Sequence, residues 1–267
     1  MSFLPLMMIS AAASLRRAVI GSLALAAASA VTARDVAPPA SGGDTAGLAV
    51  LAAPAYAGSD EYRARVLPQF DLRWRTGAFL STADGLGYRL SAGALSVGVQ
   101  VTADRGRRER DSEALKGLGD VKARPELGVF AQAPLGDSGA GSVSLRYGSG
   151  NDRRGLVLKL SAMQSIPLSA AWSAQAGIAA TLANARHQQA YFGVTPGQSA
   201  ASGLPVFEPG SGWREVGAIG GFGYRAGDRD HVSFGVAMVS LQGDARHSPL
   251  VRRRAAPAAT LSWNHTL

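Results

Sequence analysis

Residues 95–102 read LSVGVQVT, and this stretch carries the pattern that decides the fold. Four apolar residues, Leu95, Val97, Val99 and Val101, alternate in it with Ser, Gly, Gln and Thr. Successive side chains of a β-strand point to opposite sides, so residues that alternate in this way fall on opposite faces. The stretch therefore predicts a strand with one apolar face and one polar face.

The same alternation recurs along the chain and predicts twelve strands. Clear cases lie also at 66–75, 142–147, 156–162, 172–181 and 232–238, and weaker ones at about 46–56, 77–82, 86–92, 124–134, 212–224 and 255–267. Helical periodicity is scarce in this part of the chain. No apolar run after the N-terminal region approaches the roughly 20 residues that a membrane-spanning helix needs. The chain from residue 46 to 267 is predicted to be all-β.

Two architectures share this alternation. A soluble β-sandwich or small barrel turns the apolar faces inward, whereas a transmembrane barrel turns them toward lipid and keeps its lumen polar. The connections distinguish them, because short turns such as 75–77 and 91–93 alternate with longer loops such as 103–123 and 184–212. This asymmetry is typical of outer-membrane barrels. We predict a transmembrane antiparallel β-barrel of about 12 strands, with short periplasmic turns and long extracellular loops.

The N-terminal residues predict export. Arg16 and Arg17 precede an apolar run from 18 to 28, and small residues follow it as far as Ala33. Positive charge, a short apolar region and small residues together are typical of a cleaved secretory signal peptide. We assign residues 1–33 to the signal peptide, 34–45 to a flexible lead-in and 46–267 to the barrel. The predicted location is the outer membrane of a Gram-negative bacterium.

Composition restricts the chemistry of the chain. It contains no Cys, so it can form neither a disulfide nor a thiolate metal site. The net charge of +8 is carried mostly by Arg, but the basic residues form no stripe, so we expect no nucleic-acid binding. No H-E-x-x-H zinc motif and no G-x-S-x-G nucleophile elbow occurs. We expect a protein that is not an enzyme, with no catalytic residue, metal or cofactor.

Three groups of residues are candidates for function. The stretch 187–207, HQQAYFGVTPGQSAASGLPVF, has no β-period, and we expect it to fold over or into the barrel mouth. Its candidate anchoring or gating residues are Tyr191, Phe192, Gly193, Thr195 and Pro196. The second group would line the lumen as a mutually paired network, because unpaired buried charge is costly. Its members are Asp71, Arg73, Glu126, Arg146, Lys159 and Glu215.

The third group lies in the mixed-charge loop 103–122 and consists of Arg105, Arg107, Arg108 and Arg110. Guanidinium forks match phosphate oxygens, so these side chains are candidates for binding the phosphates of lipopolysaccharide. Whether the lumen is open or plugged is left open at this stage, because a barrel of about twelve strands permits both. The expected surroundings are outer-membrane lipid and lipopolysaccharide.

Several blocks of the sequence resemble the MipA/OmpV family of outer-membrane proteins. They are 56–63 (YAGSDEYR) with 67–68 (LP), 80–88 (LSTADGLGY), 115–121 (LKGLGDV), 189–196 (QAYFGVTP) with 201–205 (ASGLP), and 248–251 (SPLV). The resemblance implies an outer-membrane β-barrel without a catalytic motif. For the namesake of the family it implies a scaffold that links a lytic transglycosylase to a penicillin-binding protein in peptidoglycan synthesis.

The family pattern also has one departure in this chain, since Leu267 stands where outer-membrane barrels usually end in an aromatic residue. A scaffold with those two enzymes as periplasmic partners is the function that the resemblance favours. Two alternatives stay open: a narrow outer-membrane pore or channel, and a surface adhesin that contacts lipopolysaccharide.

Overall fold

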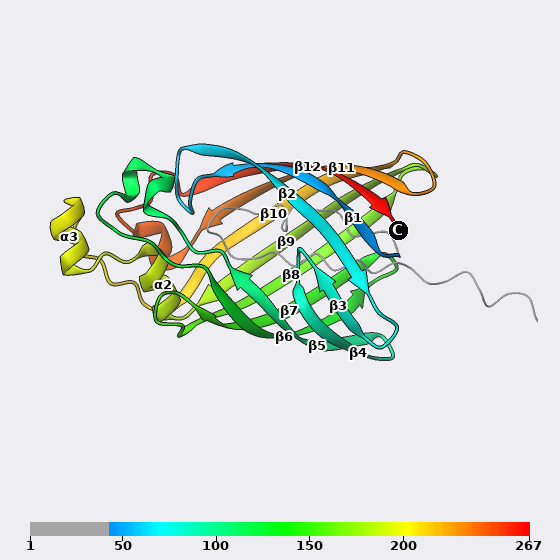
Figure 1. The fold of residues 1–267 in the computed structure, drawn as a ribbon, viewed down its shortest axis with the longest axis horizontal. Helices are drawn as coiled ribbons and strands as arrows, with labels where there is room; N and C mark the ends of the chain where they lie inside the picture. The colour runs from blue at the N-terminus through cyan, green and yellow to red at the C-terminus, as the bar shows by residue number, and fades with distance from the viewer. Residues whose placement is uncertain (1–42) are drawn as a thin grey trace, which may run out of the picture.

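A computed structural model describes residues 43–267, which form one closed antiparallel barrel of twelve strands (Figure 1). Each strand pairs with its neighbours in sequence, and β1 pairs with β12 to close the ring. The strands are β1 (Thr45–Pro54), β2 (Tyr62–Arg73), β3 (Ala78–Ser81), β4 (Gly85–Ala92), β5 (Leu95–Asp104), β6 (Arg124–Leu135), β7 (Gly139–Ser149), β8 (Gly155–Pro167), β9 (Trp172–Ala183), β10 (Gly212–Arg225), β11 (Asp230–Leu241) and β12 (Ala255–Thr266). The predicted twelve-stranded barrel is confirmed. The predicted signal peptide and residues 34–42 of the predicted lead-in lie outside the described residues.

The apolar faces of the strands point outward. On β5, Leu95 and Val99 are 46% and 57% exposed, whereas Gln100 and Thr102 are 7% and 5% exposed. A soluble sandwich would show the opposite arrangement, because it buries its apolar face. Large apolar side chains on the outside and polar ones inside are the arrangement of a barrel surrounded by lipid.

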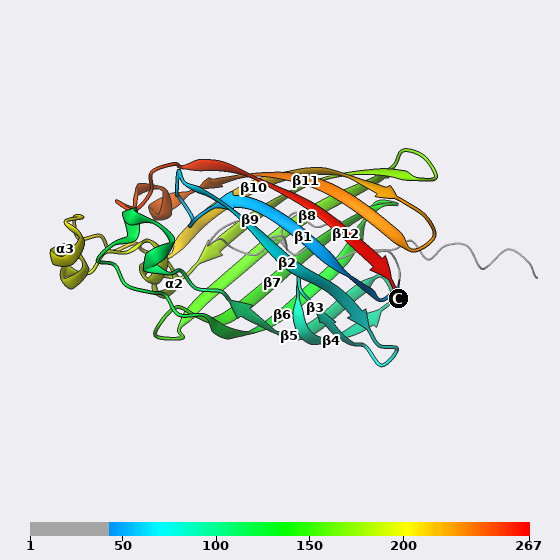
Figure 2. The same cartoon turned by 45° about the horizontal axis from the view of Figure 1, so that its top comes forward.

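The two ends of the barrel differ (Figures 1 and 2). At one end, which we call the short-turn end, brief turns join β2 to β3, β4 to β5, β6 to β7, β8 to β9 and β10 to β11, and the C-terminus lies beside them. At the other, the loop end, longer connections hold the helices α2 (Ala185–Phe192) and α3 (Pro196–Ser202) and the 3₁₀ turns η1 (Glu109–Asp111), η2 (Glu113–Leu115) and η3 (Gly243–His247). Within residues 43–267, no helix is long and apolar enough to cross a membrane.

The stretch 187–207 contains helices that its sequence did not predict. Asn184 caps α2 by accepting a hydrogen bond from the backbone N–H of His187. At α3, Thr195 and Gln198 form a capping box, in which each side chain accepts from the backbone of the other. With 8 and 7 residues, the two helices are too short to show a clear amphipathic period.

The inner wall of the barrel is not polar throughout, although a polar lumen is expected of a transmembrane barrel. Seven small or apolar side chains form a continuous buried patch that we call the apolar wall. They are Ala49, Leu51, Ala53, Ala179, Ile219, Ala237 and Ala258. Most of them are alanines, and an alanine on the inner face of a strand does not interrupt an alternating pattern. Alternation alone therefore cannot separate this wall from a polar one.

Candidate functional site: the capped loop end

Four connections at the loop end pack together into a single cap. They are residues 55–61, 105–123, 184–211 and 242–254, and they share two buried apolar clusters. One cluster contains Tyr56, Leu115, Leu118, Val194 and Leu250, with Ala55; the other contains Val121, Tyr191, Phe192, Leu241 and Ala245. Because each cluster draws residues from three or more parts of the chain, the loops are held to one another and to the barrel.

Side-chain hydrogen bonds join three of these loops to one another and to β5. The Ser248 hydroxyl donates to the carbonyl of Phe192 at 2.6 Å, and the Tyr56 hydroxyl donates to that of Leu250 at 2.9 Å. Burial raises the pKa of the Tyr56 phenol, so the group keeps its donating proton. Tyr191 donates its hydroxyl proton to the Asp104 carboxylate at the top of β5. The stretch 187–207 is thereby attached to the barrel mouth.

Arg107 has a different place from the one its sequence context predicted. Its guanidinium donates to the carbonyl of Tyr191 at 3.0 Å, and the residue is only 4% exposed. Burial also lowers the pKa of Arg107. The side chain therefore supports the cap and is not available to lipid phosphates. Arg105, Arg108 and Arg110 are exposed in the same loop, and for them phosphate contact stays a prediction.

The other candidates of the stretch 187–207 take separate roles. Tyr191 and Phe192 are 4% and 0% exposed, inside the cap. Gly193 ends α2 at a point where a Cβ atom would lie 2.1 Å from the Gln189 amide nitrogen and 2.6 Å from the Gln189 carbonyl oxygen. Thr195 caps α3, and Pro196 is exposed in the first turn of that helix. Pro196 is therefore not an apolar anchor, contrary to our prediction.

His187 lies at the centre of a buried network beneath α2. Its Nδ1 atom is 2.7 Å from the Ser149 hydroxyl, and its Nε2 atom is 2.8 Å from the Arg214 guanidinium. Arg214 also donates to the Glu215 carboxylate at 3.0 Å. All four residues are buried. The network connects the cap, through α2, to the inner face of β7 and β10.

The hydrogen bonds fix the tautomer of His187. Arg214 can only donate, so the Nε2 atom of His187 must accept, and the ring proton lies on Nδ1 and is donated to Ser149. Burial, followed by the neighbouring guanidinium of Arg214, lowers the pKa of His187 well below its usual range. Ser149 and His187 are therefore not a nucleophile and its base, because the histidine nitrogen that faces the hydroxyl carries the proton.

Two β-bulges place the partners of His187. The pairing of β7 with β8 shifts register between Tyr147 and Ser149, and that of β10 with β9 shifts between Trp213 and Glu215. At a bulge two residues of one strand oppose a single residue of its partner. Arg214 and its neighbour Glu215 can thus both be buried at the barrel mouth. Strict alternation places residues 149 and 214 on the outer face, so periodicity does not predict that Ser149 and Arg214 lie inside.

The predicted lumen network occupies two separate levels. Four of its residues, Glu126, Arg146, Lys159 and Glu215, lie on the inner face near the loop end, and we call them with Arg214 the charged belt. Glu126 and Arg146 form a buried ion pair at 3.2 Å. Two further predicted members, Asp71 and Arg73, pair with each other at 2.9 Å near the short-turn end.

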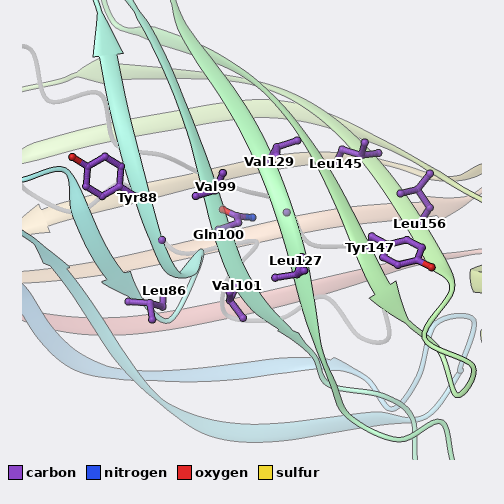
Figure 3. Close-up of a pocket in the computed structure, with 12 residues that line it drawn as sticks. Leu86, Tyr88, Val99, Gln100, Val101, Leu127, Val129, Leu145, Tyr147 and Leu156 are labelled. Carbon is purple, nitrogen blue, oxygen red and sulfur yellow. The ribbon is translucent and has the colours of Figure 1, made fainter.

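The outer surface carries two apolar grooves. One, of about 560 Å³, crosses β4 to β8 between Leu86 and Leu156 (Figure 3). The other, of about 600 Å³, crosses β8 to β11. Neither groove brings acidic or basic side chains together. Among residues 43–267, no group of His, Asp and Glu side chains is placed to hold a metal ion.

Apolar residues outside, short turns at one end and a folded cap at the other define an outer-membrane β-barrel. The chain belongs to the MipA family, described as MltA-interacting protein MipA, whose family model matches residues 46–267. A comparison with curated proteins gives no match.

Among solved structures, the chain is similar to the NanC porin, with 10% identity and a TM-score of 0.48 over 84% of this chain and 99% of that one. It is also similar to an outer membrane channel from Pseudomonas putida F1, with 11% identity and a TM-score of 0.46 over 87% and 97% of the two chains. For the KdgM porin the identity is 7% and the TM-score 0.44, over 84% and 99%.

Proposed function

We propose that this protein is a non-enzymatic scaffold in the outer membrane of a Gram-negative bacterium. It would link a lytic transglycosylase to a penicillin-binding protein in peptidoglycan synthesis. Membership of the MipA family carries this proposal, since the family is described by its interaction with MltA and its model covers the described residues apart from the first three, 43–45.

We assign partner docking to the short-turn end. Short turns of outer-membrane barrels face the periplasm, where enzymes of the cell wall act. At the loop end, Phe192, Val194 and Leu250 are 0–1% exposed, so these apolar residues of the cap clusters are engaged within the chain. The turn between β8 and β9, in contrast, presents Leu168 at 56% exposure.

Two exposed residues at opposite ends offer a matched test. A photo-crosslinking side chain at Leu168 probes the short-turn end, and one at Val206, which is 49% exposed, probes the loop end. We expect crosslinks in cells to a lytic transglycosylase from position 168 and none from 206. Purified barrel should also retain purified transglycosylase. Retention no greater than that of a barrel from another family would overturn the scaffold proposal.

A second function, a narrow channel gated by the cap, is favoured by one observation. The charged belt lines the inner wall directly beneath the cap, and its buried Arg214–Glu215 ion pair is joined to α2 through His187. Charged rings on a barrel wall determine which ions pass. In planar bilayers we expect rare openings that become more frequent when the cap is loosened by Phe192→Ala. A correctly folded, inserted barrel that stays silent in both forms would refute this function.

A further inference from the structure

We propose that the lumen admits small organic anions with an apolar tail. This inference rests on the proposed channel function and specifies its solute. It is carried by the order of three kinds of surface along the inner wall: the charged belt, the apolar wall and a level of polar side chains. These surfaces match a solute that has a charged group at one end and an apolar tail at the other.

The charged belt is the part nearest the cap. It contains three cations, Arg146, Lys159 and Arg214, against two carboxylates, Glu126 and Glu215. The belt therefore has a net charge of +1, taken over these five groups. Lys159 lies opposite Thr181 of β9, which in turn lies opposite Glu215 of β10. A positive constriction attracts anions and repels cations.

The part of the apolar wall on β11, β12 and β1 lies across the lumen from Arg146 and Lys159, whereas Arg214 is on β10, the strand that also carries Ile219. The residues of the whole wall lie on β1, β9, β10, β11 and β12, whereas Glu126, Arg146 and Lys159 lie on β6, β7 and β8. In a closed ring of twelve strands, β1 and β7 are six strands apart and stand on opposite sides. An alkyl chain can therefore contact Ile219 and Ala237 while its anionic group stays beside the cations.

On β9 to β12 a level of polar side chains lies nearer the short-turn end than the residues of the apolar wall, whereas on β1 the wall continues beside it, because Leu51 lies opposite Thr260 and Ala49 opposite Ser262. The pairing registers place Gln175 of β9, Gly221 of β10, Gly235 of β11 and Thr260 of β12 side by side. Gln175 and Thr260 are 7% and 2% exposed, and the Gln175 amide and the Thr260 hydroxyl have no hydrogen-bond partner in the described part of the chain. Buried polar groups are normally satisfied, so both are available to a polar ligand.

The positions along β9 give the three surfaces their order. Thr181 is at the belt, Ala179 belongs to the apolar wall and Gln175 belongs to the polar level. Along β9, Thr181 and Ala179 are two residues, or about 7 Å, apart, and Thr181 and Gln175 are six residues, or about 20 Å, apart. A solute with a tail of about six carbons can thus leave its anionic group at the belt while its tail contacts the apolar wall. The amide and hydroxyl donors of the polar level are the next partners for that anionic group.

Bi-ionic reversal potentials of the purified barrel in planar bilayers test this selectivity. The probes are sodium hexanesulfonate, sodium methanesulfonate and hexyltrimethylammonium chloride, which separate the effect of the charge from that of the tail. We expect hexanesulfonate to be several-fold more permeant than either of the other two. Equal permeability of the two sulfonates, or a preference for the cation, would overturn the inference while the channel proposal stands. A silent, folded barrel would overturn both.

Two variants assign the selectivity to the named surfaces. Ile219→Asn places an amide on the apolar wall and should lower the permeability ratio of hexanesulfonate to methanesulfonate at least threefold. Ile178→Asn is its control, because Ile178 lies on the neighbouring strand and is 65% exposed on the outside. Lys159→Gln should weaken anion preference for both sulfonates equally. If Ile219→Asn does not fold, Lys159→Gln still tests the inference. Unchanged charge selectivity in that variant would contradict the proposed role of the charged belt.

Discussion

Removal of one aromatic ring should open the cap without unfolding the barrel. Phe192 is fully buried at the end of α2, in the cluster with Val121, Leu241 and Ala245, which come from two other loops and from β11. Its contacts are thus made to the cap and to the barrel mouth. The ladder of strand hydrogen bonds closes below this cluster and does not depend on it.

The magnitude follows from the complete burial of the Phe192 ring. Truncation of a buried Phe to Ala typically costs about 3–5 kcal/mol, which combines the lost transfer free energy with that of the cavity. Each 1.4 kcal/mol is about a factor of ten in an equilibrium constant. If the contacts of Phe192 are lost when the cap opens, the open population of Phe192→Ala should rise by about two to three and a half powers of ten.

Hydrogen exchange followed by mass spectrometry measures this change segment by segment. We expect exchange to accelerate in α2 and in residues 105–123 and 242–254, while the strands keep their protection and the barrel keeps its heat-modifiable gel migration. Val206→Ala is the matched control, because Val206 lies in the same connection but is 49% exposed. It should leave exchange nearly unchanged.

Two results would refute this reasoning. Unchanged exchange in α2 would mean that Phe192 does not hold the cap. Accelerated exchange in β9 and β10 together with α2 would mean that the cap and the barrel form one cooperative unit. The second result would also remove the basis for a gate that moves independently of the wall.

Three further changes address the cap and the network beneath it. Gly193→Ala places a methyl group against Gln189 and should weaken the cap by about 1–3 kcal/mol. At Gly197 an added Cβ atom meets no atom within 4 Å, so Gly197→Ala should leave the cap unchanged or slightly stronger. The rate at which a protease cleaves the loops compares the two variants. Arg214→Met removes one partner of a buried ion pair and should cost about 3–5 kcal/mol, measured as a lower temperature of the heat-modifiable transition. The pKa of His187 is lowered in the closed cap and returns toward about 6.5 when the cap opens. The open state then binds more protons, so the stability of the cap should be complete above about pH 6.5 and fall as the pH drops below it. Hydrogen exchange at several pH values measures this dependence, and His187→Gln should remove it.

The barrel could be predicted because its signal is repeated. Alternation over twelve stretches, together with the asymmetry of the connections, specifies both the outward apolar faces and the sorting of loops to one end. The apolar wall was missed for a physical reason. An alanine side chain is small enough to fit either the apolar or the polar face of an alternating pattern. Only the pairing registers show that Ala49, Ala53, Ala237 and Ala258 form one continuous patch.

The network at His187 could not be predicted from periodicity. Ser149 and Arg214 reach the histidine because β7 and β10 are bulged, and a bulge breaks the alternation that identifies the inner face. Arg107 was misplaced because a run of charged residues normally lies in solvent. In this chain the guanidinium compensates a backbone carbonyl at the end of α2, a long-range partner that no local pattern indicates.

The two proposed functions use opposite ends of the barrel and can therefore be separated. A scaffold depends on the turns at the short-turn end, whereas a gate depends on α2, Phe192 and the charged belt. No residue of the cap clusters belongs to a short turn. Phe192→Ala should thus change conductance without changing the retention of a lytic transglycosylase, and substitutions at Leu168 should do the reverse. If one substitution altered both conductance and retention, binding of the partner at the turns would have to change the structure of the barrel wall. The conductance of the lumen would then depend on whether the partner is bound.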